Sequence, residues 1–126
     1  MIGYMMVGTN DLTAATTFYD IILDLVGLIR VYTQDDQIGY APKAKRDEIE
    51  FYICKPFDRK IATVGNGTMV AFFVKSKVTV DRFHSAGLKL GAKNEGDPGA
   101  RPGKDDPYYA YLRDLDGNKL CVYAPS

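Results

Sequence analysis

The apolar residues near the start of the chain follow two different spacings. Residues 2–7 form an apolar run that ends at the turn-forming segment 8–11, which predicts a strand and then a turn. Apolar side chains then recur at the spacing that places them on one helical face, at Leu12, Ala15, Phe18, Tyr19, Ile22, Leu23 and Val26. Asp11 is suited to cap the start of this helix, and Gly27 to end it. The pattern therefore predicts a strand followed by a helix.

Short segments rich in β-branched and aromatic residues follow the helix. They cover residues 28–32, 38–41 and 49–54, and polar turns separate them, which predicts three strands. Residues 55–67 contain proline, glycine and polar residues and are interpreted as a connector.

The second half of the chain repeats this order. Residues 68–74 form an apolar run, Ser76 is suited to cap a helix, and helical spacing continues up to Gly91. A short strand near 92–95, a loop over 96–107 and two strands at 108–113 and 119–123 are then predicted. The turn 114–118 is expected to join the last two strands as a hairpin.

The two halves align at a fixed offset of 65 positions. The offset pairs Tyr4 with Met69, Asp11 with Ser76, Ala15 with Val80, Phe18 with Phe83, Tyr19 with His84 and Leu23 with Leu88. The helix-cap, aromatic and aliphatic positions of the first half therefore coincide with those of the second half. We interpret the chain as one α+β domain over residues 1–126, built from a duplicated βαβββ module with halves at about 1–62 and 63–126.

Composition limits the partners and the chemistry. The 126 residues are 46% apolar and carry 16 basic and 16 acidic side chains, so nucleic acid and anionic membranes are not expected partners. No segment is apolar enough over a bilayer's width, and the two cysteines lie far apart, which favours a cytoplasmic protein without disulfides. The single histidine, His84, excludes a site with several histidines from one chain.

Several motifs together resemble the vicinal oxygen chelate superfamily, which contains the glyoxalases, the bleomycin-resistance proteins and the extradiol dioxygenases. They are V-G-T-N-D-L at 7–12 with Phe18-Tyr19, K-P-F-D at 55–58, G-N-G-T at 65–68 and R-D-L-D-G-N at 113–118. The resemblance covers essentially the whole chain. It implies that each module forms a curved half-barrel of mixed strands with its helix outside, that the strands enclose a pocket, and that a homodimer forms.

Enzymes of that family bind one divalent metal, and the resemblance places its ligands here at Tyr4, Met69, Cys121 and either Glu50 or Tyr52. Of these, only Glu50 is a good ligand for a hard metal. We therefore expect the family fold without a catalytic metal and with no other cofactor. A divalent metal would be needed only if the chain uses an unusual ligand set.

Tyrosine supplies the candidate ligand pocket, since nine are present and tryptophan is absent. Strand alternation puts Tyr109 and Tyr111 on one face, and Tyr123 on the face of Cys121. The expected pocket residues are Tyr4, Met6, Tyr52, Met69, Tyr109, Tyr111, Cys121 and Tyr123, with Arg101 as an anion contact from a covering loop. Such a pocket suits a flat organic ligand. Alternatively, the tyrosines pack against helices or a dimer partner.

Three functions remain open. The first is a small-molecule binder similar to the bleomycin-resistance proteins. The second is a glyoxalase-like lyase or dioxygenase-related enzyme, with Glu50 as base or ligand and Tyr4 or Tyr52 as proton donor. The third is an interaction module with a filled cavity. His84 is expected to be a structural or surface histidine because it falls on a helix, and Cys121 is expected to be a small buried residue rather than a nucleophile.

Overall fold

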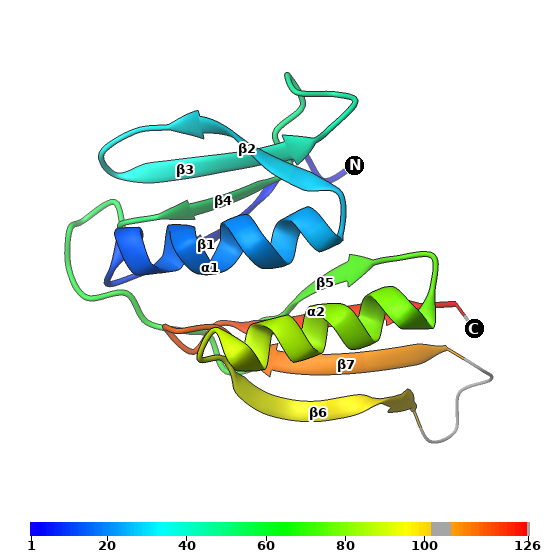
Figure 1. Cartoon of the computed structure of the whole chain (residues 1–126). Helices are drawn as coiled ribbons and strands as arrows, with labels where there is room; N and C mark the ends of the chain where they lie inside the picture. Colours follow the sequence, from blue (N-terminus) through cyan, green and yellow to red (C-terminus); the bar gives the residue numbers. More distant parts are fainter. Residues whose placement is uncertain (102–106, 126) are drawn as a thin grey trace. The chain divides into compact units, whose positions relative to one another are not determined.

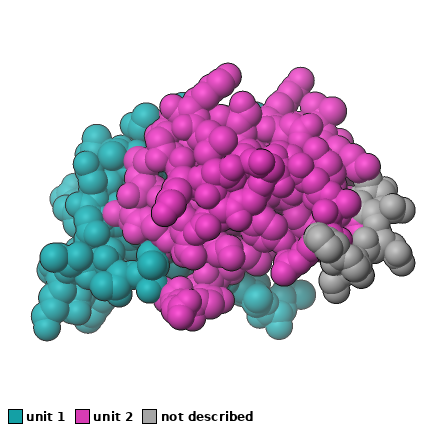
Figure 2. Space-filling view, turned by 90° about the horizontal axis from the view of Figure 1, so that it is seen from below, with its two compact units in different colours: residues 1–64 teal, residues 65–126 magenta. Residues whose placement is uncertain are grey.

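The chain forms two compact units, Met1–Val64 and Gly65–Ser126. They are described from a computed structural model that covers residues 1–101 and 107–125, and Figure 2 distinguishes them by colour. Each unit contains one four-stranded sheet and one helix within the described residues.

The first unit has the element order strand, helix and three strands. Its elements are β1 (Met5–Gly8), α1 (Leu12–Leu25), β2 (Leu28–Thr33), β3 (Gln37–Pro42) and β4 (Phe51–Cys54). The sheet order is β1-β4-β3-β2, with β1 parallel to β4 and the other pairs antiparallel. The sheet is therefore mixed and open, with β1 and β2 at its edges.

The second unit repeats the same topology (Figure 1). Its elements are β5 (Val70–Phe73), α2 (Lys77–Lys89), β6 (Lys93–Ala100), β7 (Tyr108–Arg113) and β8 (Lys119–Ala124). The sheet order is β5-β8-β7-β6, and β5 runs parallel to β8. The predicted duplication of a βαβββ module in an α+β fold is confirmed.

Both helices begin and end where the sequence predicts. The Asp11 carboxylate accepts a hydrogen bond from the backbone N–H of Ala14 at 3.0 Å, and the Ser76 hydroxyl accepts one from that of Thr79 at 3.3 Å. These bonds satisfy N–H groups that have no partner inside the helix. Neither helix in the described part of the chain is long and apolar enough to cross a membrane.

The core of each unit lies between its helix and one face of its sheet. In the first unit, the Tyr19 ring of α1 lies 5.2 Å from the Phe51 ring of β4. In the second, the Phe83 ring of α2 lies 5.8 Å from the Phe72 ring of β5. Because side chains alternate along a strand, the residues between the core positions point to the opposite face of the sheet. That face is available for a site.

The extent of β6 differs from the sequence prediction. A short strand at 92–95 and a loop from residue 96 were expected, but β6 continues to Ala100. Gly96, Pro98 and Gly99 suggested a loop, yet a strand at the sheet edge tolerates them because its outer hydrogen-bonding groups need no partner strand. The pairing with β7 is irregular on both sides of Gly96, which accommodates these residues. Residues 102–106 of the expected loop lie outside the described residues.

Candidate functional site

The face of the second sheet opposite α2 carries a row of tyrosine rings. Tyr109 of β7 is the register partner of Tyr123 of β8, and their ring centroids lie 5.4 Å apart with an interplanar angle of 18°. Tyr111, two residues along β7, lies 6.2 Å from Tyr109 with an interplanar angle of only 4°. Three nearly parallel phenol rings therefore line one face of this sheet.

Gly96 of β6 makes room for the last ring of the row. It is the register partner of Tyr111, and a Cβ atom at this position would lie 2.8 Å from Cδ2 of that ring. Real Cβ contacts are essentially never that short. The glycine therefore lets the Tyr111 ring lie directly against the backbone of β6.

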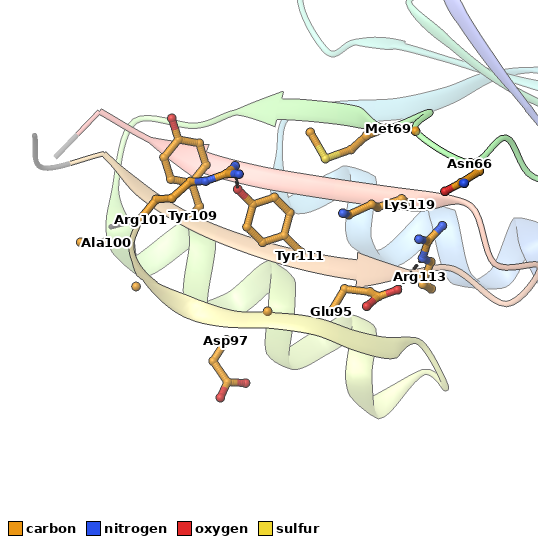
Figure 3. Close-up of a pocket in the computed structure, with 13 residues that line it drawn as sticks. Asn66, Met69, Glu95, Asp97, Ala100, Arg101, Tyr109, Tyr111, Arg113 and Lys119 are labelled. Atoms are coloured by element: carbon orange, nitrogen blue, oxygen red, sulfur yellow. Dashed lines mark hydrogen bonds and ion pairs between the residues drawn. The ribbon is translucent and has the colours of Figure 1, made fainter. Parts of the chain in front are cut away.

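Two cationic side chains meet at the Tyr111 ring. A guanidinium N–H of Arg101 donates to the Tyr111 hydroxyl at 2.8 Å, and the Arg101 Cζ lies 5.8 Å from the ring centroid. The Lys119 Nζ lies 5.5 Å from the same centroid. Both distances are within the range of a cation–π interaction. Figure 3 shows the three side chains together at the pocket.

A third cation, Arg113, is already paired with a carboxylate. Its Nε donates to the Glu95 carboxylate at 2.6 Å, and its Nη1 donates to the Gly117 carbonyl at 3.1 Å. The Arg113 hydrogen bond holds the pKa of Glu95 below its ordinary value. Among the residues that the structure describes, no carboxylate lies within ion-pair distance of Arg101 or Lys119.

These side chains line a pocket of about 660 Å³ in the second unit. Met69, Arg101, Tyr109 and Tyr111 were expected there from the sequence. The other lining residues are Asn66, Gly67, Glu95, Gly96, Asp97, Gly99, Ala100, Arg113 and Lys119. In Figure 3 the Asp97 carboxylate points away from the labelled tyrosines, on the other side of β6. The charged side chains that face the tyrosines are thus mainly cationic.

His84 supports β6 from the helix side of the sheet. Its side chain is buried, and its Nε2 lies 2.9 Å from the Asn94 Oδ1. That oxygen also accepts the Gly96 N–H at 2.9 Å, while the Asn94 amide donates to Asp97 at 2.7 Å. Since an amide oxygen can only accept, the His84 Nε2 donates. The histidine is structural, as expected, and it holds the irregular segment that carries Gly96.

Two expected pocket residues of β8, Cys121 and Tyr123, do not line this pocket, and the other expected site residues lie in the first unit. The Tyr4 and Tyr52 rings are 5.0 Å apart in an edge-to-face arrangement, and Met6 is the register partner of Tyr52. These residues lie on the face opposite α1, because Phe51 and Ile53 face the core. Glu50 immediately precedes β4 and its side chain is exposed. The pocket of the second unit is not lined by any of these four residues.

The donor set at the positions implied by the family resemblance fits a divalent metal poorly. Met69 offers a thioether and Cys121 a thiol, while hard cations prefer oxygen and imidazole nitrogen. Across residues 1–101 and 107–125, no three side chains from histidine, cysteine, aspartate and glutamate are grouped so that they could hold a metal ion. The residues at these positions therefore do not fit the divalent metal that the resemblance implies.

Cys121 of β8 is the register partner of Tyr111, and only 1% of its surface is exposed. Burial raises the pKa of its thiol to about 11, although the charges of Arg101 and Lys119 act in the opposite direction. At neutral pH the group is therefore a protonated thiol and a poor nucleophile or metal ligand.

The rate of alkylation measures how far burial lowers the thiolate fraction of Cys121. In a Cys54→Ser variant at pH 8, we expect Cys121 to react with iodoacetamide at least about a hundredfold more slowly in the folded protein than in urea, because its thiolate fraction is that much smaller. Mass spectrometry of the alkylated peptide gives both rates. Equal rates in the folded and unfolded protein would contradict a buried, protonated thiol.

Apart from Arg101, sequence reasoning missed the charged residues of the pocket, although part of the signal was present. Lys119 shares the strand parity of Cys121 and Tyr123, and Arg113 shares that of Tyr109 and Tyr111. Glu95 was expected at the end of a short strand and was not singled out, and Gly96 gave no signal because its segment was expected to leave the sheet.

Solved structures resemble this chain over almost its full length. A glyoxalase/bleomycin resistance protein from Albidiferax ferrireducens T118 is 36% identical, with a TM-score of 0.86 and coverage of 98% of each chain. The fosfomycin resistance protein FosX from Mesorhizobium loti is 19% identical, with a TM-score of 0.70 and coverage of 100% of this chain and 92% of its own.

A lactoylglutathione lyase from Agrobacterium tumefaciens is 20% identical, with a TM-score of 0.70 and coverage of 98% of this chain and 92% of its own. The likeness to this protein and to FosX extends to the fold alone. No protein-family model and no curated protein matches the sequence. The identity and coverage of the Albidiferax ferrireducens protein decide the family: the chain belongs to the glyoxalase/bleomycin resistance family of the vicinal oxygen chelate superfamily.

Proposed function

We propose that the protein binds a small aromatic organic molecule in the pocket of its second unit, without a catalytic metal. The observation that carries this proposal is the pocket of about 660 Å³ lined by the parallel rings of Tyr109 and Tyr111. Ligand pockets of proteins commonly have volumes of roughly 300–1,000 Å³ and combine apolar walls with a few polar groups.

The tyrosine row is suited to hold a flat ring. Parallel phenol rings offer aromatic faces in one orientation, so a planar ligand that stacks on Tyr109 is also parallel to its neighbours. The half-exposed Met69 adds an apolar and adaptable wall, since a thioether side chain adjusts to the shape of its partner. These features favour recognition of shape and aromatic surface.

A glyoxalase-like lyase is the weaker candidate. It would need Glu50 as base or as metal ligand, but this carboxylate is exposed and does not line the described pocket. Cys121, at another position that the family uses for a ligand, is a protonated thiol. An interaction module with a filled cavity is also less favoured, because Met69 lines an open pocket instead of filling it.

Two further expectations remain predictions. A homodimer follows only from the family resemblance. A cytoplasmic location is supported by the free thiols of Cys54 and Cys121, which suit a reducing compartment.

Replacing Tyr109 by alanine tests the proposed pocket. We expect 2-naphthamide or 2-naphthoate to bind the wild-type protein and to shift backbone amide signals of β7 and β8 in a two-dimensional NMR titration. The Tyr109→Ala variant should bind up to about tenfold more weakly, since one aromatic contact is lost.

Tyr108→Ala is the matched control for this test. Tyr108 is the adjacent residue of β7, but its hydroxyl donates to Asp81 of α2 at 2.8 Å, on the opposite face of the sheet. Its removal should leave the affinity unchanged. The proposed function is wrong if neither probe binds, or if the shifted signals map to α2 instead of the tyrosine face.

A further inference from the structure

We infer that the ligand is an organic anion, in which a carboxylate or phosphate group attached to a planar ring is bound by Arg101 and Lys119. This inference rests on the proposed function and adds the chemical class of the ligand. It follows from the distribution of charge in the pocket, from the contacts of the two cations and from the orientation of the tyrosine rings.

The charges of the pocket do not cancel. Five acidic or basic side chains of the described residues line it, and one of them, Asp97, points to the other side of β6 (Figure 3). Glu95 and Arg113 neutralise each other through their 2.6 Å hydrogen bond. Arg101 and Lys119 remain, and no described carboxylate pairs with either. Two positive charges in one pocket favour an anionic ligand.

The two cations converge on one point. Both contact the Tyr111 ring, Arg101 through its hydroxyl as well as its face. Both also lower the pKa of Cys121, the register partner of Tyr111, although less than burial raises it. A guanidinium has five N–H donors and the Tyr111 bond uses one, which leaves donors with the geometry that carboxylate and phosphate oxygens require.

The tyrosine rings indicate where the planar part of the ligand lies. The cations are packed against Tyr111, so the stacking surface lies on Tyr109, whose ring is parallel to those of both Tyr111 and Tyr123. A ligand whose anionic group reaches Arg101 and Lys119 would therefore lay its ring over Tyr109. An inorganic anion would contact the two cations but not the stacking surface of Tyr109, and a neutral ring would contact that surface but not the cations.

A substitution of Glu95 is expected to raise the affinity for an anion, not to lower it. Among the described lining residues, the Glu95 carboxylate is the one negative charge that faces the tyrosine side, and it is hydrogen-bonded to Arg113. The isosteric change Glu95→Gln removes that charge and releases a third cation for the ligand. Anion affinity should then rise, although most substitutions in a binding pocket lower affinity.

The experiment compares 2-naphthoate with 2-naphthamide, which has nearly the same shape but no charge. By calorimetry or NMR titration at low ionic strength, the full chain should bind 2-naphthoate about tenfold more tightly than 2-naphthamide. Added sodium chloride should narrow this difference, because salt screens charges at a half-exposed site. Inorganic phosphate, tested alone, should bind far more weakly than 2-naphthoate.

The variants assign the effect to individual side chains. Arg101→Gln and Lys119→Gln should each weaken 2-naphthoate binding by about three- to tenfold and leave the affinity for 2-naphthamide unchanged. Glu95→Gln should tighten 2-naphthoate binding a few-fold. Arg82→Gln is the matched control, because Arg82 is an exposed arginine of α2 that does not line the pocket, and it should change neither affinity.

The outcomes separate the two proposals. Equal affinity for the charged and neutral probes would overturn the anion inference and support the aromatic pocket. A failure of both probes would overturn the proposed function together with the inference. Phosphate that binds as tightly as 2-naphthoate would overturn the role of the ring, and weaker 2-naphthoate binding in Glu95→Gln would overturn the charge argument.

Discussion

Replacing Phe83 by alanine is expected to lower the free energy of unfolding by about 3–5 kcal/mol, because it leaves a large cavity in the second unit. Phe83 has no exposed surface and lies at the centre of the contact between α2 and its sheet, against the Phe72 ring. The expected loss is large compared with the total stability of a small domain. Urea denaturation followed by circular dichroism measures it.

The internal repeat supplies a second position for the same test. Phe18 occupies the equivalent place in α1 and is 1% exposed, so Phe18→Ala should cost a similar amount. Phe57 is fully exposed, and Phe57→Ala should change stability by less than about 0.5 kcal/mol. Similar losses at Phe83 and Phe57 would contradict the described core.

Replacing Asp114 by alanine is expected to cost about 2–3 kcal/mol and to disrupt the ligand pocket. The buried Asp114 carboxylate accepts hydrogen bonds from the backbone N–H groups of Asp116 and Asn118, at 2.9 and 2.8 Å, and from the Asn118 amide at 2.9 Å. Alanine would leave three donors of the β7–β8 turn without this acceptor. Chemical denaturation measures the loss.

The same turn holds two charged residues of the pocket in place. Arg113 and Lys119 are register partners on the two sides of it, so Asp114→Ala should also weaken 2-naphthoate binding in the fraction that stays folded. Leu115→Ala is the control, since Leu115 belongs to the same turn but is 43% exposed and should matter little. Equal effects of the two substitutions would show that the carboxylate does not organise the hairpin.

Local patterns were sufficient to predict most of the fold. The helix limits followed from cap residues such as Asp11 and Ser76 and from apolar spacing, both of which act within one or two turns of the chain. The duplication was visible because Phe18 and Phe83 occupy equivalent core positions. Strand alternation also placed Tyr109 and Tyr111 on one face, and they are indeed stacked in parallel.

The candidate site was predicted only in part. Arg101 was expected to contact an anion from a covering loop, but it directly follows β6 and bonds to Tyr111, ten residues away in the sequence. The length of β6 could not be predicted from its glycines and proline, because those residues are acceptable only at a sheet edge. Which strand forms the edge depends on the order of all four strands.

The sequence by itself determined the order of strands and helices, the two modules, the residues that cap the helices and the tyrosines that share a face. These properties depend on residues within a few positions of one another. Only the tertiary structure brought Arg101, Tyr111 and Lys119 together, paired Arg113 with Glu95 and buried Cys121. These contacts depend on the register between β6, β7 and β8, where pairing over long sequence separations decides which side chains meet.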